Sequence, residues 1–272
     1  MRVLNIAHRG ARSLAPENTL AAAEKGLEIG ADLWETDVTV TADGELILFH
    51  DHSLGRTTDV ESHFPGRSPW IVSTFTLEEI RQLNPGARFI DTDPFEQIAD
   101  GVVSPGDLVD LICVRVPTLR EALVFTQDTH WRVNLELKPI PPPMESYPIV
   151  ERVLAVMEEV KIDAGRVVIS SFNHEWLREV QRLRPDIIVQ ALVGDLSIGE
   201  PPEFDTYNAS AMMVDEEQIR SAIAMGVAVN LYTVNEQDAM RRFIAAGVSG
   251  LFTDFPQRLK SLIKASPGPG SF

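Results

Sequence analysis

Two carboxylates, Glu35 and Asp37, stand one residue apart in the mostly apolar stretch 33–40. Because the side chains of a strand alternate between its faces, both carboxylates can project from the same face. Glu136 occupies a similar position in the stretch 132–138. Three clustered carboxylates repel one another without a cation, and an oxygen-only set suits Mg²⁺ or Ca²⁺ better than zinc. The pattern therefore predicts one divalent cation, Mg²⁺ or Ca²⁺, held by Glu35, Asp37 and Glu136.

Two histidines, His8 and His50, each follow an apolar stretch directly. A pair of imidazoles can supply a general acid and a general base, since histidine titrates near neutral pH. Arg9 offers a planar fork for phosphate oxygens, and Lys138 offers a point charge. These residue types predict phosphate chemistry, with His8 and His50 as the acid/base pair and with Arg9 and Lys138 on the phosphate.

The same charges allow an alternative interpretation as buried ion pairs, Glu35 with Arg9 and Glu136 with Lys138, because ion-pair networks also cluster charged side chains. Glu17 is predicted to orient Arg9 or a substrate hydroxyl. Both interpretations place these residues close together, and only the first requires a cation.

Three further positions have both a structural and a functional interpretation. Asn18 or Thr19 is expected to cap the first turn of a helix, and we place Asn18 there. Phe172 and Tyr232 follow later strands, where they can either complete the core or line a pocket. The sequence favours neither choice for the two aromatic residues.

The composition argues against a nucleic-acid ligand. The 272 residues include 40 acidic and 24 basic side chains, which gives a formal charge of -16 and repels a phosphate backbone. The single cysteine, Cys113, excludes an internal disulfide, and we find neither a signal-peptide pattern nor an 18-residue apolar span. We expect a cytoplasmic protein that binds a small molecule and does not insert stably into a membrane, and the oligomeric state stays open.

Apolar stretches typical of strands alternate with helical patterns along the chain. This alternation predicts an α/β protein with a mostly parallel sheet covered by helices. Nine candidate strands are present, so a closed barrel of eight strands requires one strand outside the ring. The candidate strands are 3–7, 33–40, 46–49, 132–138, 167–170, 187–192, 211–214, 227–233 and 251–253.

The connection between the second and third candidate strands is too short for a helix, because only the residues 38–44 separate Asp37 from Glu45. If Asp43 and Gly44 form a two-residue hairpin, Asp37 lies directly across from His50. If the two strands are parallel, the connection in an extended conformation is still long enough to bring the chain back to the start of the neighbouring strand. Both geometries place His50 beside Asp37.

The segment of about 52–115 breaks the alternation with prolines, glycines and charges, and carries one helical signature at 76–80. A loop region of this length inside a domain is usually functional. We interpret it as an inserted subdomain that could cover the mouth of a site. The domain prediction is one barrel over residues 1–264, followed by a disordered tail at 265–272.

The ordered set of motifs resembles the glycerophosphodiester phosphodiesterase family. The resemblance covers nearly the whole chain. The motifs are His8-Arg9-Gly10, Pro16-Glu17-Asn18-Thr19, Glu35-Thr36-Asp37-Val38, Phe49-His50-Asp51, Val116-Pro117-Thr118-Leu119, Leu135-Glu136-Leu137-Lys138, Ser170-Ser171-Phe172, Tyr232-Thr233-Val234-Asn235 and Thr253-Asp254-Phe255-Pro256.

This resemblance implies a TIM-type (β/α)₈ barrel of the PLC-like phosphodiesterase type, with an inserted subdomain after the third strand. It implies metal-dependent hydrolysis of glycerophosphodiesters to sn-glycerol 3-phosphate and an alcohol. By similarity, the carboxylates named above bind the cation, the two histidines act as acid and base, and the arginine and lysine hold the phosphate. Family members often carry Trp where this chain has Tyr232.

Three other functions were weighed. A lysophospholipase D acts on a diester that keeps one acyl chain, and it needs an apolar channel or patch. A catalytically silent barrel would act as a binding protein, but such proteins usually lose their ligands or acid/base pair. A metal-dependent sugar or enolate enzyme gives no reason for paired histidines beside Arg9. The nucleophile, water or the glycerol 2-hydroxyl, and the roles of the individual histidines stay open.

Overall fold

The computed structural model describes residues 2–265 and contains a closed barrel of parallel strands. The ring runs in the order β1-β9-β8-β7-β6-β5-β4-β2, and a parallel pairing between β1 and β2 closes it. This confirms the predicted barrel. The strands of the ring are β1 (Leu4–Ala7), β2 (Leu33–Val40), β4 (Val133–Leu137), β5 (Val167–Ser171), β6 (Ile188–Val193), β7 (Thr206–Ser210), β8 (Ala228–Tyr232) and β9 (Gly250–Thr253).

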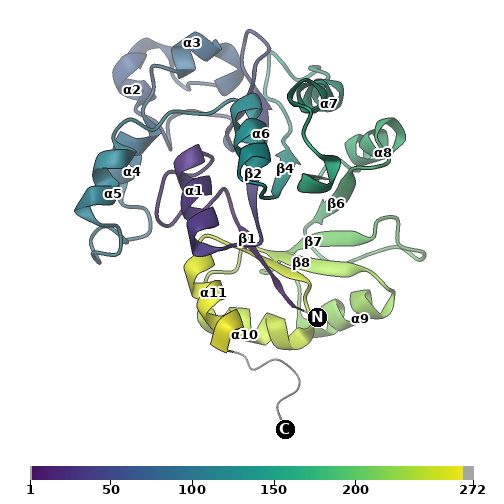
Figure 1. Cartoon of the computed structure of the whole chain (residues 1–272). Coiled ribbons are helices and arrows are strands. Elements are labelled where there is room, and N and C mark those ends of the chain that lie inside the picture. Colours follow the sequence, from purple (N-terminus) through teal and green to yellow (C-terminus); the bar gives the residue numbers. More distant parts are fainter. Residues whose placement is uncertain (1, 266–272) are drawn as a thin grey trace.

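Helices surround the barrel and pack on its outer face (Figure 1). Helix α1 begins after Thr19, whose hydroxyl accepts a hydrogen bond from the backbone N–H of Ala22, and it ends at Gly30 with a φ of 78°. Thr19, and not Asn18, is therefore the N-cap. The surrounding helices are α1 (Leu20–Ile29), α6 (Leu119–Asp128), α7 (Ile149–Val160), α8 (His174–Leu183), α9 (Glu216–Ala224), α10 (Gln237–Ala246) and α11 (Pro256–Ala265).

The strand outside the ring is β3 (Leu46–Leu48), which pairs antiparallel with β2. Of the two alternatives for this connection, the hairpin is present, but its turn contains three residues and not two, because the backbone N–H of Thr41 donates to the Glu45 carbonyl. Gly44 has a φ of +84°, the left-handed conformation that a three-residue hairpin loop requires. Asp37 consequently faces Phe49, whose backbone N–H donates to the Asp37 carbonyl at 3.0 Å. His50 follows as the next residue.

The seventh strand of the chain, β7, lies earlier than the sequence predicted. The strand is Thr206–Ser210, and not the apolar run 211–214. The buried side chain of Asn208 accepts a hydrogen bond from the side-chain amide of Asn230, and this polar residue interrupts the apolar pattern of the true strand. Met212 and Met213 are 95% and 57% exposed, so the apolar run is a surface feature.

The segment between β3 and α6 contains more helix than predicted. The single expected helix is present as α3 (Leu77–Ile80), with a capping box between Thr76 and Glu79. Three other short helices accompany it, and two of them begin with proline at the first position, where a missing N–H costs nothing. These are α2 (Val60–His63), α4 (Pro85–Thr92) and α5 (Pro105–Leu111). They form a lobe beside α1 (Figure 1).

The alternation of β2 separates an apolar outer face from a polar inner face. Trp34 and Val38 are fully buried in the core between the barrel and the helices. Leu33 points inward and packs with Ile6 and Phe252 at the base of the barrel. Further along the same inner face come Glu35 and Asp37, so the strand delivers two carboxylates to the open end of the barrel.

Residues 266–272 of the predicted tail lie outside the described residues, and α11 ends at Ala265. Within residues 2–265, no helix has the length and apolar character needed to span a bilayer.

Candidate active site at the carboxyl ends of the strands

The carboxyl ends of β2 and β4 bring three carboxylates together. The two strands are parallel neighbours, and their register places Asp37 directly beside Glu136. Glu35 lies two residues earlier on the same face of β2. One oxygen atom of each carboxylate lies within 4.8 Å of those of the other two. Such a compact oxygen set can coordinate one hard cation.

The surroundings of these carboxylates also fit a cation. Oε1 of Glu35 and Oδ1 of Asp37 are buried and accept no hydrogen bond within the described residues. A buried oxygen without a partner is costly, and a metal ligand is one way to satisfy it. Burial, followed by the negative charges of Asp37 and Glu136, raises the pKa of Glu35 well above its usual range. A bound cation would relieve this repulsion.

Arg9 and Lys138 lie on either side of the carboxylates. The backbone N–H of Arg9 donates to Glu35 at 2.9 Å, while its guanidinium lies 2.8 Å from Glu17 and 3.2 Å from Asp37. The ammonium of Lys138 donates to Glu136 at 2.8 Å. One of the two ion pairs of the alternative interpretation is therefore present. The guanidinium of Arg9 pairs with Glu17 and Asp37 in place of the expected Glu35.

The turn after β1 depends on Gly10. Its φ is +79°, and a Cβ at this position would lie 2.5 Å from the carbonyl carbon of Ala22. Only glycine allows the chain to pass so close to α1. The turn places both His8 and Arg9 at the open end of the barrel.

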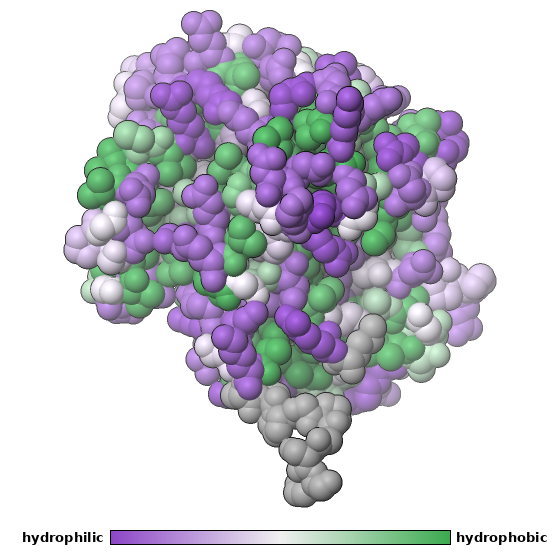
Figure 2. Space-filling model, viewed as in Figure 1, coloured by the Kyte–Doolittle hydropathy of each residue, from purple (hydrophilic) through white to green (hydrophobic). Residues whose placement is uncertain are grey.

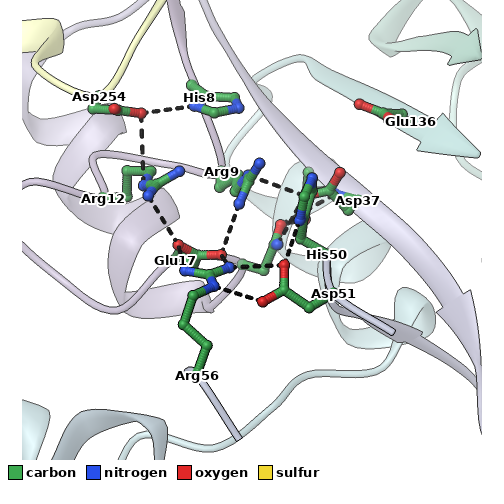
Figure 3. Close-up of polar contacts among 12 residues, drawn as sticks. His8, Arg9, Arg12, Glu17, Asp37, His50, Asp51, Arg56, Glu136 and Asp254 are labelled. Carbon is green, nitrogen blue, oxygen red and sulfur yellow. Dashed lines mark hydrogen bonds and ion pairs between the residues drawn. The ribbon is translucent and has the colours of Figure 1, made fainter. Parts of the chain in front are cut away.

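His8 is held by an aspartate from the opposite end of the sequence. Its Nδ1 lies 2.7 Å from Oδ1 of Asp254 (Figure 3). The other carboxylate oxygen of Asp254, Oδ2, accepts a hydrogen bond from the side-chain amide of Asn235. Because a carboxylate only accepts, the proton of the imidazole sits on Nδ1 and Nε2 carries the lone pair. Burial, with a smaller contribution from the charge of Arg9, lowers the pKa of His8, so the ring is neutral at pH 7.

His50 has a matching partner in the next residue. Its Nδ1 lies 2.6 Å from Oδ1 of Asp51, and Asp51 accepts two hydrogen bonds from Arg56, at 2.5 and 3.1 Å. Burial works to raise the pKa of Asp51, but the bonds from His50 and Arg56 hold it well below its usual range. Both histidines therefore keep Nε2 as the nitrogen available for proton transfer.

Glu17 connects the two histidine–aspartate pairs. Its carboxylate contacts Arg9, Arg12 and Arg56, at distances of 2.8, 3.2 and 2.6 Å (Figure 3). Arg12 lies 3.6 Å from Asp254, and Arg56 bonds Asp51. Although burial acts to raise the pKa of Glu17, the three arginines hold it well below its usual range. The predicted contact with Arg9 is part of this larger network.

Asn18 fixes the geometry of Asp37. Its side-chain amide donates to Oδ2 of Asp37 at 2.9 Å, and its side-chain carbonyl accepts from the backbone N–H of Asp37 at 3.1 Å. The φ of Asn18 is 57°, a left-handed conformation that asparagine tolerates better than most residues. Asn18 is thus a site residue and not the helix cap that the sequence predicted.

A cavity of about 240 Å³ opens where these side chains converge. Tyr232 donates its hydroxyl to the Val193 carbonyl at 2.8 Å, and burial, followed by Glu136, raises the pKa of Tyr232 to about 12. Its ring forms an edge-to-face contact with Phe172, which is 49% exposed. Both aromatic residues line the cavity. The other lining residues are His8, Arg9, Glu35, His50, Glu136, Lys138, Ser170, Leu192, Thr233 and Phe252.

No residue of the predicted insert, 52–115, is among those that line this cavity, as far as residues 2–265 show. The insert contributes Arg56 behind the site. Arg56, Arg12 and the contact of Asn235 with Asp254 are site features that the sequence did not predict. Arg56-Thr57-Thr58 follows the His50-Asp51 motif closely in the sequence, and this proximity could have indicated that Arg56 belongs to the site.

Comparisons with known proteins agree with this geometry. A model of the glycerophosphoryl diester phosphodiesterase family matches residues 8–258. The chain belongs to this family. A glycerophosphodiester phosphodiesterase of Caldanaerobacter subterraneus subsp. tengcongensis is 33% identical over 97% of this chain and 99% of its own length. Another, from Bacillus subtilis, is 30% identical over 94% of this chain and 84% of its own.

A solved structure extends the comparison to three dimensions. An Oleispira antarctica phosphodiesterase in complex with the product sn-glycerol-3-phosphate has a TM-score of 0.77 and 25% identity, with 96% of each chain covered. Together with the family match, this likeness identifies the chain as an enzyme, a phosphoric diester hydrolase built on the TIM barrel.

Proposed function

We propose that the protein hydrolyses glycerophosphodiesters to sn-glycerol 3-phosphate and an alcohol, using His8 and His50 as acid and base beside one divalent cation, Mg²⁺ or Ca²⁺. The observation that carries the proposal is the pair of histidines in one cavity, each held at Nδ1 by its own aspartate. A neutral imidazole with Nε2 free accepts a proton, and its protonated form donates one.

The cation would be held by Glu35, Asp37 and Glu136, since one oxygen of each lies close to those of the other two, and since Oε1 of Glu35 and Oδ1 of Asp37 accept no hydrogen bond. When bound, it supplies positive charge that stabilises the negative charge developing on the phosphoryl oxygens. Arg9 and Lys138 line the same cavity and add two further positive groups for those oxygens. Because both also contact the carboxylates, they hold the phosphate next to the cation site.

The proton transfers follow from the two imidazoles. One Nε2 takes the proton of the attacking oxygen, which belongs to water or to the glycerol 2-hydroxyl, as that oxygen bonds to phosphorus. If the 2-hydroxyl attacks, a water molecule opens the resulting cyclic phosphate in a second step and gives sn-glycerol 3-phosphate. The other imidazole, protonated at Nε2, gives its proton to the alcohol oxygen as the bond between that oxygen and phosphorus breaks. The aspartates keep both rings oriented throughout, as Asp254 and Asp51 are bonded to the opposite ring nitrogens.

The test is a panel of glycerophosphodiesters with choline, ethanolamine, glycerol and inositol as the alcohol. The enzyme is treated with a chelator and assayed, and Mg²⁺ or Ca²⁺ is then restored separately. We expect no turnover after chelation and recovery with one of the two cations. Absence of turnover for every diester with either cation would contradict the proposal, and full activity in the chelator would contradict the metal requirement.

A further inference from the structure

A second cavity, of about 290 Å³, lies between the insert and the turn that follows β1. Its lining residues come from the segment 12–17, ahead of α1, and from the segment 56–95 of the insert. Within residues 2–265, it shares no lining residue with the catalytic cavity described above. Its size lies at the lower end of the range for pockets that bind small organic molecules. The molecule therefore has room for a second ligand beside the substrate.

The wall of the second cavity is positively charged. Arg12, Arg56 and Arg88 line it, and Glu17 is the only carboxylate among the lining residues that the structure describes. The charge of Glu17 is shared among three arginines, two of them in this wall. The chain as a whole has a formal charge of -16, so this local excess of positive charge is an exception on an acidic protein. Such an excess attracts an anion.

Two of these arginines keep hydrogen-bonding capacity for a ligand. Arg88 reaches the carboxylate of Glu61 and the carbonyl of Arg56 only at 3.4 Å in each case. Nε of Arg12 is buried and donates no hydrogen bond within residues 2–265, and it lies 3.6 Å from the carboxylate of Asp254. A guanidinium carries five N–H donors, and its planar fork matches carboxylate and phosphate oxygens.

The rest of the wall is largely apolar. Phe89 is 6% exposed and belongs to the buried cluster that joins the insert to Ala22 of α1. The ring of Phe95 lies beside the guanidinium of Arg12, with 5.1 Å from its centroid to the guanidinium carbon, and stands edge-to-face on Phe255. Arginines beside aromatic rings suit a ligand that carries both a negative charge and a flat apolar part.

The arginines of the second cavity also bond the aspartates that orient the two catalytic imidazoles (Figure 3). Arg56 bonds Asp51, and Arg12 lies 3.6 Å from Asp254. Both arginines contact Glu17. An anion in the second cavity competes with these three carboxylates for the same guanidinium groups. Its binding consequently reaches both histidines without entering the catalytic cavity.

We propose that the second cavity is an inhibitory site for a small organic anion, a phosphate or a carboxylate with a flat apolar part. The bound anion weakens the bonds of Arg12 and Arg56 to the carboxylates that orient the histidines, and it thereby lowers kcat. It leaves the catalytic cavity open, so it does not compete with the substrate. The binding site stands on the second cavity alone, whereas the effect on kcat rests on the proposed function.

The insert also carries exposed apolar side chains that an aromatic compound can contact outside the second cavity. Val102, Val109 and Ile112 are 53%, 65% and 52% exposed, and Figure 2 shows apolar side chains gathered over α4 and α5. None of the three lines the second cavity. A neutral aromatic compound therefore measures adsorption to this surface separately from binding at the arginines.

The first experiment is a calorimetric titration of the full chain after chelation, which needs no turnover. The ligands are phenyl phosphate, phenylacetate, inorganic phosphate and benzyl alcohol. We expect an aromatic anion to bind more tightly than both inorganic phosphate and benzyl alcohol. The comparison of phenyl phosphate with phenylacetate shows whether the site prefers a phosphate or a carboxylate. Equal affinity for benzyl alcohol would overturn the proposal, because the arginines would then contribute nothing.

Variants locate the binding event. Arg88→Gln should weaken the binding of the preferred anion about tenfold or more, since it removes a charged donor. Glu61→Gln is the matched control, because it breaks the same ion pair but keeps the guanidinium, and it should bind at least as tightly as the wild type. Thr92→Glu adds a negative charge at an exposed lining position and should also weaken binding, which provides a second variant if Arg88→Gln does not fold.

A variant of the catalytic cavity separates the two sites. The binding event that Arg88→Gln removes should persist in Lys138→Gln, because Lys138 lines only the catalytic cavity. Loss of this event in Lys138→Gln would place the anion in the catalytic cavity and overturn the proposal. Wild-type affinity in both Arg88→Gln and Thr92→Glu would do the same.

The second experiment measures initial rates with glycerophosphocholine at a saturating cation concentration. Saturation with the preferred anion should lower kcat of the wild type and of Glu61→Gln about fivefold or more. Arg88→Gln should have the wild-type kcat without the anion and keep it when the anion is added. Competition in the catalytic cavity raises KM alone, so it does not imitate this result. An unchanged kcat at concentrations that saturate the titrated site would overturn the inhibitory role.

The two experiments fail in different ways. Absence of turnover without any added anion contradicts the proposed function, while the titrations still decide whether the second cavity binds the anion. Normal turnover together with no binding at Arg88 contradicts the second site and leaves the proposed function intact.

Discussion

The guanidinium of Arg56 donates to both carboxylate oxygens of Glu17, at 2.9 and 2.6 Å. The same group bonds both oxygens of Asp51, which holds Nδ1 of His50. Arg56 comes from the insert, whereas Glu17 precedes α1 and Asp51 follows β3. One planar side chain thus joins three parts of the chain behind an imidazole that faces the cavity (Figure 3).

The first prediction concerns this fork. In Arg56→Lys the charge is kept, but one ammonium cannot bond two carboxylates in two planar pairs. We expect kcat for glycerophosphocholine to fall about tenfold or more, because Asp51 and His50 lose their fixed orientation. KM should change less, since Arg56 does not line the cavity. Arg241→Lys, which alters an exposed pair with Asp238 on α10, is the matched control. Wild-type kcat in Arg56→Lys would contradict the positioning role.

The second prediction concerns Glu17 and the dependence of the free energy of unfolding on pH. The pKa of Glu17 is held far below the 4.5 of an unperturbed glutamate, so the unfolded chain binds a proton at a pH where the folded chain does not. Stability from this group is present above pH 4.5 and is lost as the pH falls below it.

We therefore expect Glu17→Gln to lower the free energy of unfolding at pH 7 by about 3 kcal/mol, because Arg9, Arg12 and Arg56 lose a shared buried carboxylate. The difference from the wild type should narrow by about 1 kcal/mol between pH 7 and pH 4. Urea unfolding at both pH values measures it, with Glu24→Gln on the exposed face of α1 as control. If wild type and Glu17→Gln differed in free energy of unfolding by the same amount at both pH values, the lowered pKa of Glu17 would be contradicted.

The third prediction is a cation-dependent gain in stability. A ligand at one hundred times its Kd stabilises the folded state by about 2.7 kcal/mol, which raises the melting temperature of a chain of this size by about 5 °C or more. The wild type should show this shift on addition of Mg²⁺ or Ca²⁺ after chelation. Glu136→Gln should lose most of it, and Glu175→Gln, in an exposed pair on α8, should keep it. Equal shifts in all three proteins would place the cation elsewhere.

The fourth prediction separates two properties of Asn18, its hydrogen bonds to Asp37 and its left-handed backbone conformation. Asn18→Ala removes the hydrogen bonds to Asp37 and places a Cβ residue without a polar side chain at a φ of 57°. Asn18→Gly removes the same bonds but accepts this φ without strain. We expect urea unfolding to show a loss of about 3 kcal/mol for alanine and about 2 kcal/mol for glycine. If Asn18→Gly were as stable as the wild type, the hydrogen bonds would contribute nothing.

The fifth prediction tests the acid/base pair. His8→Ala and His50→Ala should each reduce kcat by about 10²–10⁴-fold, and the wild-type rate should have a bell-shaped dependence on pH. His63→Ala, in the half-exposed helix α2 of the insert, is the control and should retain activity. A pH–rate profile that is flat between pH 5 and pH 8, or normal turnover in either active-site variant, would rule out the proposed roles.

The spacing of residues determined much of the site in advance. Alternation along β2 placed Glu35 and Asp37 on one face, and the prediction needed nothing beyond the two-residue period of a strand. The capping box at Thr76 marked a helix start correctly, because a helix N-terminus is a local feature. The count of nine strands correctly required one to lie outside the ring.

The tertiary structure decided the features that depend on distant segments. The left-handed Gly44 moved the β2–β3 register by one residue, and the partners of both histidines became visible only when Asp254 and Arg56 were brought to them by folding. The apolar run at Met212 and Met213 was predicted to be a strand, because an apolar pattern in the sequence does not distinguish a buried strand from exposed apolar side chains. Sequence fixes which side chains alternate, whereas long-range packing sets which of them meet.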